Sequence, residues 1–583
     1  MDCKGLLGID AGGTHTDAVL LTQHDGAWRL TAAAKVETCH EDLPGTVRRV
    51  LAHLMQEAEA TGCGFALRRV ERVSLGTTLA VNALVQDRGD RVGLALSAGP
   101  GLDPRRFALG EDVCIVSGGL DHRGVEVSPL DCTTLTREAA RWQTSGVTAV
   151  ACVGKFSPRN PAHEQAMARA AGTALPVTMG HTLSGQLNFP RRIATAYFNA
   201  AVARLQNDFL NAVEAALRDL GITAAPRLLK ADGGAAPFSL AKQEPVQSIL
   251  SGPAASVMGV MALCPQAAKG CSLLLDMGGT TSDLALFADG SPVMEREGML
   301  LQGRRTLVRS LACVSIGVGG DSQLHVSGHS LSALVSVGPE RLGPAMAFGG
   351  QSPTLLDALN LLDCPAGDMT GTRGNVAASL QGVTALAHKS GLAPNELARQ
   401  AVDDALTQIS QAVQELVTRI NARPIYTLAA LRAVREVRPE CIWLVGGPAH
   451  CIRERLSAAL QIPVFCPPHS AVANAVGAAL ALPSHSLEIY ADTGRALLRV
   501  PALDLEESIS RSCTLENVKA RAVTLLTEHL AQAGGDDAAV EVVEADIFAT
   551  LDERGRGSKD MRVVCQARPG IAGQLALTDL KAE

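Results

Sequence analysis

Two glycine-rich segments carry the residues best suited to chemistry in this 583-residue chain. The first, Asp10-Ala-Gly-Gly-Thr-His-Thr-Asp-Ala-Val-Leu20, recurs 266 positions later as Asp276-Met-Gly-Gly-Thr-Thr-Ser-Asp-Leu-Ala-Leu286, and six of eleven positions are identical. Glycine lets the backbone approach a ligand closely, and threonine hydroxyls can donate hydrogen bonds to anionic oxygens. The repeat therefore predicts a pair of phosphate-binding turns.

The aspartate before each turn adds metal chemistry. Asp10 and Asp276 carry carboxylates, which are hard oxygen ligands suited to holding Mg²⁺, usually through its waters, against nucleotide phosphates. A single Gly-Gly-Thr would be interpreted as an ordinary tight hairpin turn. Because the turn and its aspartate occur twice, we expect a magnesium nucleotide between the two copies.

The flanking sequences predict the elements that position these turns. Apolar runs at 6–9 and 273–275 lead into the turns, and apolar runs at 18–21 and 284–287 follow them, so each copy predicts strand, glycine turn, strand. Two such hairpins suggest two related domains that face one cleft.

A third glycine turn lies near the end of the second half. A predicted strand at 441–445 ends on Gly446 and Gly447, before a predicted helix at 452–460, and such a turn could admit the flat face of a nucleoside. A helix of small residues follows at 471–479 and can pack closely on a neighbouring helix. This order of elements is similar to the layout of the actin, sugar kinase and heat-shock ATPase superfamily.

Composition excludes several classes of function. The 52 basic and 59 acidic side chains give a net charge of −7, and aromatic residues make up only 3%, so neither a basic field nor stacking platforms for nucleic acid are expected. The longest apolar run, 471–482, is shorter than the roughly 18 to 20 residues that span a bilayer, so we expect no membrane insertion. The 15 cysteines include no Cys-x-x-Cys, which favours reduced thiols in the cytoplasm.

Other nucleotide and hydrolase signatures are missing from the sequence. Gly154-Lys155 is followed by Phe156 rather than serine or threonine, and no Gly-x-Gly-x-x-Gly follows a strand, so a P-loop or Rossmann site is disfavoured. The sequence also contains no Gly-x-Ser-x-Gly and no His-Glu-x-x-His. We therefore expect no independent hydrolytic centre.

Ordered blocks of sequence identify a family. Over roughly residues 5–480 the chain resembles the ATP-binding A component of the hydantoinase/oxoprolinase family, in the blocks Gly8-Ile-Asp-Ala-Gly-Gly-Thr-His-Thr-Asp17, Leu75-Gly-Thr-Thr-Leu-Ala-Val-Asn-Ala-Leu84, Leu187-Asn-Phe-Pro-Arg-Arg-Ile-Ala-Thr-Ala196, Ser251-Gly-Pro-Ala-Ala255 and Asp276-Met-Gly-Gly-Thr-Thr-Ser-Asp283. The resemblance implies an α/β fold with two actin-like (ribonuclease H-like) ATPase lobes around a nucleotide cleft. It also implies that ATP drives the opening of a cyclic amide or imide such as a hydantoin or 5-oxoproline.

The resemblance implies a role for each matching residue. Asp10, Asp276 and Asp283 would be catalytic, with Asp10 and Asp276 organising Mg²⁺, and Gly446 and Gly447 would border adenosine. The residues that would bind phosphate are Gly12, Gly13, Thr14, Thr16, Gly278, Gly279, Thr280 and Thr281. A substrate role is the hypothesis for Thr77, Thr78, Asn82, Arg191 and Asp321.

Structural alternatives compete with the substrate hypothesis. Helix capping explains Thr77, Thr78 and Asn82 equally well. Arg191 and Arg192 could neutralise an anion, but we favour a merely solvated side chain for at least one of them. Asp321 replaces a usual glycine and could bind a cation or a substrate nitrogen.

Two further departures from the family pattern bear on specificity. His15 stands where relatives commonly carry phenylalanine, and it could titrate near neutral pH or fill the same volume as a neutral ring, which we favour. The stretch 337–348 looks shortened relative to relatives, so we expect an altered substrate preference.

The domain organisation follows from these elements. We expect one ATPase lobe at 1–187, a second at 188–485 and a small α+β domain at 486–583, in which a helix at 514–530 precedes strands at 540–549 and 561–567. Further predicted helices lie at 254–263 and 394–420, with another that runs from Pro190 to residue 220.

Partners and alternative activities follow from the family. Ring opening is expected to need a B-type subunit, and a homo-oligomer stays open. The alternative functions are the ATPase subunit of a ketone carboxylase, a regulatory ATPase and a small-molecule kinase of the same fold.

Overall fold

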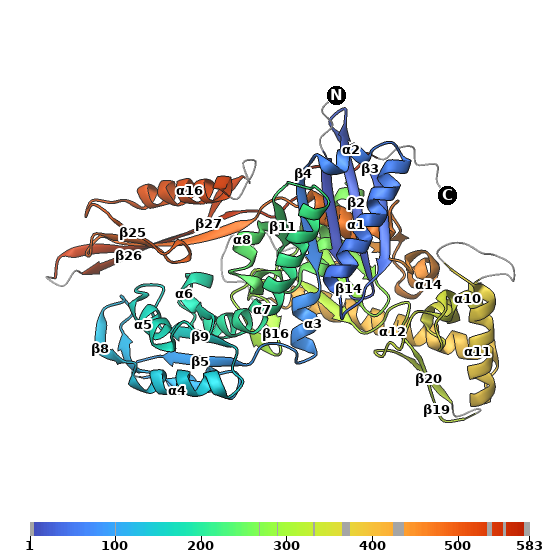
Figure 1. Cartoon of the computed structure of the whole chain (residues 1–583), viewed down its shortest axis with the longest axis horizontal. Helices are drawn as coiled ribbons and strands as arrows, with labels where there is room; N and C mark the ends of the chain where they lie inside the picture. Colours follow the sequence, from blue (N-terminus) through green and yellow to red (C-terminus); the bar gives the residue numbers. More distant parts are fainter. Residues whose placement is uncertain are drawn as a thin grey trace.

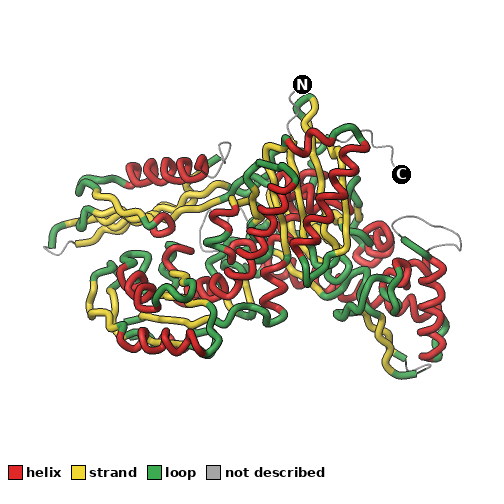
Figure 2. Tube along the Cα trace, in the orientation of Figure 1, coloured by secondary structure: helices red, strands yellow, loops and turns green. Residues whose placement is uncertain are grey.

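The computed structural model arranges the chain as a central body with three extensions (Figure 1). It describes residues 5–99, 101–267, 269–288, 290–329, 333–363, 373–423, 436–532, 539–551 and 555–576. Figure 2 shows strands enclosed by helices in the central body, whereas the upper of the two extensions on the left consists mainly of strands with one helix along it.

The first hairpin belongs to a six-stranded sheet. Strands β1 (Gly5–Ala11) and β2 (His15–His24) are antiparallel and β3 (Ala27–Glu37) continues the meander, while β4 (Val70–Thr77) and β11 (Pro226–Leu229) run parallel to β1. The short β12 (Ala235–Pro237) forms the edge, so the order is β12-β11-β4-β1-β2-β3.

The second hairpin repeats this arrangement. Its sheet has the order β15-β14-β13-β21-β22, in which β13 and β14 are antiparallel and β21 runs parallel to β13. The strands are β13 (Ser272–Met277), β14 (Ser282–Ala288), β15 (Ser291–Pro292), β21 (Cys441–Val445) and β22 (Val464–Phe465), and β18 (Cys313–Ile316) pairs with β14. Both sheets therefore have the 3-2-1-4-5 order of a ribonuclease H-like lobe, and both predicted strand–turn–strand units are confirmed.

Helices α9 (Ser251–Leu263) and α15 (Ala473–Leu480) lie in one hydrophobic core with residues of both sheets. Their backbones meet at glycines: an added Cβ would lie 2.2 Å from the carbonyl oxygen of Ala473 at Gly259 and 2.1 Å from that of Ala255 at Gly477. At Gly8 on β1 a Cβ would lie 2.0 Å from the carbonyl oxygen of Ala475. The predicted close packing of the small-residue helix is thus confirmed.

Two insertions extend the lobes (Figure 1). The first holds a parallel sheet of order β10-β9-β5-β6, and the second holds three helices beside the hairpin of β19 and β20. Their elements are β5 (Val92–Ser97), β6 (Val113–Ile115), β7 (Ser117–Leu120), β8 (Glu126–Asp131), α4 (Thr133–Thr144), β9 (Ala149–Gly154), α5 (Ala162–Ala171), β10 (Val177–Met179) and α6 (Gly180–Leu183), then β19 (Leu324–Ser327), β20 (Leu334–Val337), α10 (Leu355–Asp363), α11 (Val376–Ser390) and α12 (Pro394–Asn421).

The C-terminal part is a five-stranded antiparallel sheet with one long helix. In Figure 1 this arm lies above the first insertion, and Arg159 of the insertion forms an ion pair of 2.7 Å with Asp560 of the arm. Its elements are β23 (His485–Asp492), β24 (Leu497–Val500), β25 (Leu505–Ser508), α16 (Leu515–Gln532), β26 (Val540–Leu551) and β27 (Gly557–Ala567).

One sheet contains strands from both sides of the expected lobe boundary. Strands β11 and β12 lie beyond residue 187 yet complete the sheet that starts at residue 5, so this sheet crosses the predicted division at 187/188. The other helices are α1 (Leu43–Ala60), α2 (Gly64–Arg68), α3 (Leu79–Val85), α7 (Phe189–Asp219), α8 (Phe238–Ala241) and α14 (Ala449–Leu460). None of the helices in the described part of the chain is both long and apolar enough to cross a membrane.

Replacing Gly477 tests the close helix contact. A Cβ at Gly477 would stand 2.1 Å from the carbonyl oxygen of Ala255, so Gly477→Ala forces two helix backbones apart and should destabilise the protein by about 1–3 kcal/mol. A lowered thermal unfolding temperature is the expected result. Gly557→Ala is the matched control, because a Cβ there meets no atom within 4 Å and should leave the unfolding temperature nearly unchanged.

Candidate nucleotide-binding and catalytic site

The two glycine turns meet each other. The hydroxyl oxygens of Thr14 and Thr280 lie 3.3 Å apart, although 266 positions separate them in the sequence. Each turn is closed by one backbone bond, from Gly12 N–H to the carbonyl of His15 at 3.1 Å and from Gly278 N–H to that of Thr281 at 2.9 Å. The predicted convergence of the two hairpins is thus present in the structure.

The third glycine turn lies against the second hairpin. Gly446 has a φ of 100°, and a Cβ there would lie 2.1 Å from the carbonyl oxygen of Met277 and 2.9 Å from Oδ1 of Asp276. Only glycine allows this approach. By contrast, a Cβ at Gly13 or Gly447 would meet no atom within 4 Å, so these two glycines border open space.

A cluster of carboxylates lies beneath the turns. Asp10 on β1 is paired across the hairpin with Asp17 on β2, and Asp276 on β13 is paired in the same way with Asp283 on β14. Asp10 and Asp276 are buried, with 4% and 8% of their surface exposed. Oδ1 of Asp10 is buried and has no hydrogen-bond partner among the described residues, which leaves an anionic oxygen for a hydrated cation.

Asp276 is held in place by the two close-packed helices. Its Oδ2 accepts hydrogen bonds from the hydroxyl of Ser256 on α9 at 2.5 Å and from the amide of Asn474 on α15 at 3.0 Å. Neither residue belongs to a glycine turn, and neither was predicted from the sequence. The available signal was Asn474 itself, a single polar side chain within the apolar run 471–482.

Burial and mutual repulsion shift the acidity of these groups. Burial, followed by the charges of Asp17 and Asp276, raises the pKa of Asp10 to about 7. Burial and Asp276 also raise the pKa of Asp283 to about 7. Lys35 compensates part of the charge: its ammonium forms an ion pair with Asp17 at 2.8 Å and donates to the carbonyl of Ala471 at 3.2 Å.

The threonines of the hairpins face different surroundings. The hydroxyl of Thr16 is buried and lies 2.9 Å from that of Thr38, whose hydroxyl donates to the carbonyl of Gly12 at 3.0 Å. Thr281 is exposed and Thr280 is partly buried. Thr14 and Thr280 are therefore the hydroxyls that stand at the junction of the turns, while Thr16 supports the first turn from within.

The segment with Thr77, Thr78 and Asn82 lies beside the first turn. The amide N–H of Thr78 donates to the carbonyl of Ala11 at 3.2 Å, and the amide of Asn82 donates to the hydroxyl of Thr78 at 3.2 Å. The hydroxyl of Thr77 accepts from the N–H of Leu79 at 3.1 Å at the start of α3. Local capping by Thr77 and proximity to the turn are thus both present.

The two arginines at the start of α7 have different surroundings. Arg191 is partly buried in the first turn of the helix. Arg192 is fully buried, and its guanidinium donates to the carbonyls of Gln186 at 3.0 Å and Lys155 at 2.8 Å. The insertion folds over Arg192, so this arginine is not the solvated one, and the expectation that at least one of the two is solvated rests on Arg191.

The structure also places His15 and Asp321. His15 is exposed, so it does not fill space in a core; partial burial and the charges of Lys35 and Arg341 lower its pKa to about 4, which agrees with the favoured neutral ring and not with titration near neutral pH. Asp321 is buried, and its N–H donates to the carbonyl of Gly279 at 2.7 Å. The structure thus attaches Asp321 to the second turn.

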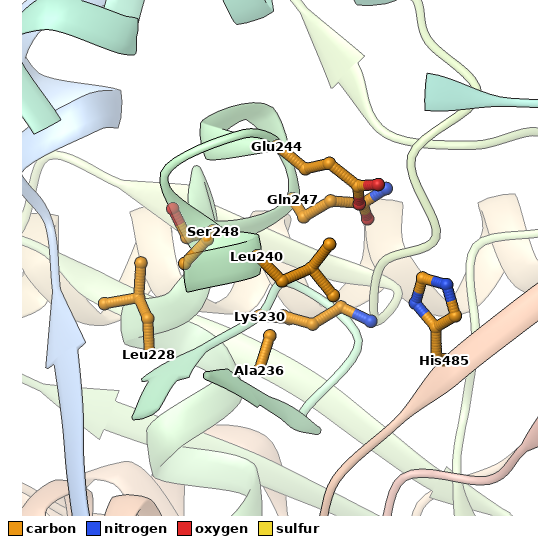
Figure 3. Close-up of a pocket in the computed structure, with 9 residues that line it drawn as sticks. Leu228, Lys230, Ala236, Leu240, Glu244, Gln247, Ser248 and His485 are labelled. Atoms are coloured by element: carbon orange, nitrogen blue, oxygen red, sulfur yellow. The ribbon is translucent and has the colours of Figure 1, made fainter. Parts of the chain in front are cut away.

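A separate pocket lies between the first lobe and the start of the C-terminal domain (Figure 3). None of the predicted site residues lines it; its walls are formed by Leu228, Lys230, Ala236, Leu240, Ala241, Glu244, Gln247, Ser248 and His485. Lys230 is already bonded there to the carbonyl of Ser484 at 2.9 Å and to its hydroxyl at 3.1 Å. We therefore place the functional site at the turns.

Metal binding at the turns would be indirect. Within the described residues, no group of three or more histidine, cysteine, aspartate or glutamate side chains is arranged to hold a metal ion. Two carboxylates from facing hairpins, Asp10 and Asp276, fit an ion that keeps several waters and binds phosphate, as Mg²⁺ does.

The fold is shared with two solved ATP-dependent enzymes. The acetone carboxylase nucleotide-free structure matches with a TM-score of 0.71 and 16% identity, over 97% of this chain and 88% of that chain. The ATP-dependent caprolactamase from Pseudomonas jessenii matches with a TM-score of 0.67 and 22% identity, over 99% and 89%. These matches confirm the predicted α/β ATPase fold class.

Sequence comparisons give the family. The caprolactamase subunit alpha of Pseudomonas jessenii is 29% identical over 383 residues, covering 60% of this chain and 53% of that protein. The chain spans about half the length of the first curated relatives that it matches. The hydantoinase/oxoprolinase family model matches residues 192–486, and the model of the family's N-terminal region matches residues 6–175. The two glycine hairpins lie one in each matched region, and the chain belongs to the hydantoinase/oxoprolinase family.

Proposed function

We propose that this chain binds Mg·ATP between its glycine turns and transfers the γ-phosphate to the carbonyl oxygen of a cyclic amide or imide, which activates the ring for opening. The observation that carries the proposal is the 3.3 Å contact between the hydroxyls of Thr14 and Thr280, in turns that each follow a buried aspartate, Asp10 and Asp276. Two phosphate-binding turns that touch define one site for a polyphosphate.

The chemistry explains why ATP would be needed. A resonance-stabilised amide is a poor electrophile, and phosphorylation turns its carbonyl oxygen into part of a leaving group. The protein must then align the γ-phosphate and spread its charge, which is a task of positioning and electrostatics. Hydantoin-type and 5-oxoproline-type rings both carry such an amide.

The described residues suggest a division of roles. Asp10 and Asp276 would organise Mg²⁺ through its waters, and Thr14, Thr280 and the adjoining glycine N–H groups would bind phosphate oxygens. Gly447, which borders open space, would admit the nucleoside. Asp283 would contribute charge from behind Asp276.

A partner subunit is part of the proposal. The caprolactamase relative is named a subunit alpha, and the chain spans about half of that protein's length. We propose that ring opening of the activated substrate takes place with a B-type subunit. The cytoplasm is the proposed location.

The alternative reaction is ketone activation. The likeness to acetone carboxylase favours it as the second candidate, because a ketone oxygen can be phosphorylated by the same arrangement of turns and Mg²⁺. The two reactions differ in the acceptor and not in the nucleotide site.

The proposal is tested by coupling between substrate and ATP turnover. The purified chain is assayed for ADP and phosphate release with 5-oxoproline, hydantoin, caprolactam, and acetone with bicarbonate, alone and with a neighbouring B-type protein. We expect a lactam or hydantoin to stimulate ATP turnover. Stimulation by the ketone alone supports the carboxylase candidate, and a stable phosphorylated product or turnover that no substrate changes contradicts ring opening.

Neutralising the paired aspartates should weaken nucleotide binding. Asp10→Asn and Asp276→Asn each remove one carboxylate from the proposed magnesium site, and we expect roughly 10- to 100-fold weaker binding of Mg·ATP by calorimetry. The matched control is Asp363→Asn, since Asp363 is exposed on α10 and pairs with Arg455. An unchanged affinity for Mg·ATP in both Asp10→Asn and Asp276→Asn would contradict the assignment of the magnesium site to these two aspartates.

Asp283 should give stability a recognisable pH dependence. Its pKa is raised from 3.8 to about 7, so ionised Asp283 destabilises the folded chain above about pH 7, and this penalty decreases progressively as the pH falls from about 7 toward 3.8. Asp283→Asn stays neutral, so its advantage in thermal unfolding temperature over the wild type should be largest at pH 8 and shrink by pH 5. An advantage that is constant or grows on acidification would contradict the buried charge.

A further inference from the structure

Arg341 lies at the edge of the site and is anchored by Asp321. Its Nε donates to Oδ2 of Asp321 at 3.2 Å, while Oδ1 of Asp321 accepts the N–H of Ala345 at 3.1 Å. The carboxylate thus holds both ends of the segment 341–345. The side chain of Arg341 keeps 22% of its surface exposed, whereas that of Asp321 keeps 11%.

The anchoring oxygen lies where the two hairpins meet. A Cβ added at Gly279 would lie 2.6 Å from Oδ2 of Asp321 and 2.9 Å from the hydroxyl oxygen of Thr14. The atom that binds Arg341 therefore borders the same small space as a phosphate-binding hydroxyl of the first hairpin. A backbone bond of 2.7 Å from Asp321 N–H to the carbonyl of Gly279 fixes this position.

Arg341 is also close to the first hairpin. Its charge is one of the causes that lower the pKa of His15, the exposed residue next to Thr14. Lys35 is the other cation that acts on His15, but its ammonium already pairs with Asp17 and donates to the carbonyl of Ala471. Arg341 is thus a cation positioned between the two turns.

The geometry of the guanidinium leaves donors for an anion. Among the described residues, the side-chain hydrogen bond of Arg341 uses Nε, and neither Nη group of the planar guanidinium forms one. An arginine fork can bind two oxygens of one phosphate, and its charge is not lost by deprotonation. A cluster of buried carboxylates alone would repel a polyphosphate, and a guanidinium near the terminal phosphate would offset this repulsion together with Mg²⁺.

We propose that Arg341, held by Asp321, binds the terminal phosphate of the nucleotide at the junction of the two turns and stabilises the charge that develops on it during transfer. The inference rests on the proposed function and extends it to a residue outside the glycine turns. The Asp321 carboxylate is then a positioning group for Arg341 and does not itself contact substrate nitrogen.

The experiment compares nucleotides that differ in the terminal phosphate. The full chain and its Arg341→Ala, Arg341→Lys and Asp321→Asn variants are titrated with Mg·ATP and Mg·ADP by calorimetry. We expect Arg341→Ala to weaken ATP roughly 10- to 100-fold while ADP changes less than threefold, because a hydrogen bond to a charged group contributes about 1.5–3 kcal/mol. Arg341→Lys should retain part of the preference for ATP, and Asp321→Asn should lose part of it.

A purely structural role of Arg341, in which it only holds the segment 341–345, predicts different results. If Arg341 only holds the segment 341–345, then Arg341→Ala lowers the affinities for ATP and ADP by the same factor, or lowers neither, and the proposal is overturned. Arg455→Ala is the control, since Arg455 forms a similar pair with Asp363 on α10. Failure of the wild-type chain to bind any nucleotide would overturn the proposed function and this inference together, whereas loss of binding in Asp10→Asn with an unchanged ATP preference in Arg341→Ala would overturn the inference alone.

Discussion

The site depends on the contact between helices α9 and α15. Glycines at 259 and 477 let the two backbones approach so closely that an added Cβ would lie about 2 Å from a carbonyl oxygen. This approach brings Ser256 and Asn474 to the same oxygen of Asp276. Since the same helices share a core with both sheets, the packing that joins the lobes also fixes the carboxylate at the floor of the site.

The mutual repulsion of the buried carboxylates beneath the turns destabilises the fold when no cation is bound. Burial, followed by the charges of Asp17 and Asp276, raises the pKa of Asp10 to about 7, and a hydrogen bond from Asn474 and the charge of Lys35 reduce this effect. Buried like charges destabilise a fold, so their presence at one point is typical of a functional site. A divalent cation and the Arg341 guanidinium would together convert this repulsion into affinity for a polyphosphate.

Local structure was predictable because local signals were strong. Glycine turns between apolar runs predicted the hairpins, and the predicted strand at 441–445 coincides with β21 (Cys441–Val445). The helix predicted at 394–420 is α12 (Pro394–Asn421). The burial of single side chains was less predictable: His15 is exposed and Arg192 is fully buried, because burial depends on which distant segments cover a residue. The expected boundary at 187/188 also divides one sheet, since β11 follows α7 in the chain and still pairs in the first sheet.

The sequence by itself determined the chemical groups of the site: two glycine turns, their aspartates and hydroxyls, and a third turn of glycines. The tertiary structure decided which of these groups act together. Thr14 and Thr280 meet while Thr16 turns inward to Thr38. Ser256 and Asn474 hold Asp276, and Arg341 binds Asp321, although Ser256, Asn474 and Arg341 come from segments outside the glycine turns. The physical reason is that a motif records the local backbone, whereas the direction and neighbours of a side chain are set by contacts between residues far apart in the chain.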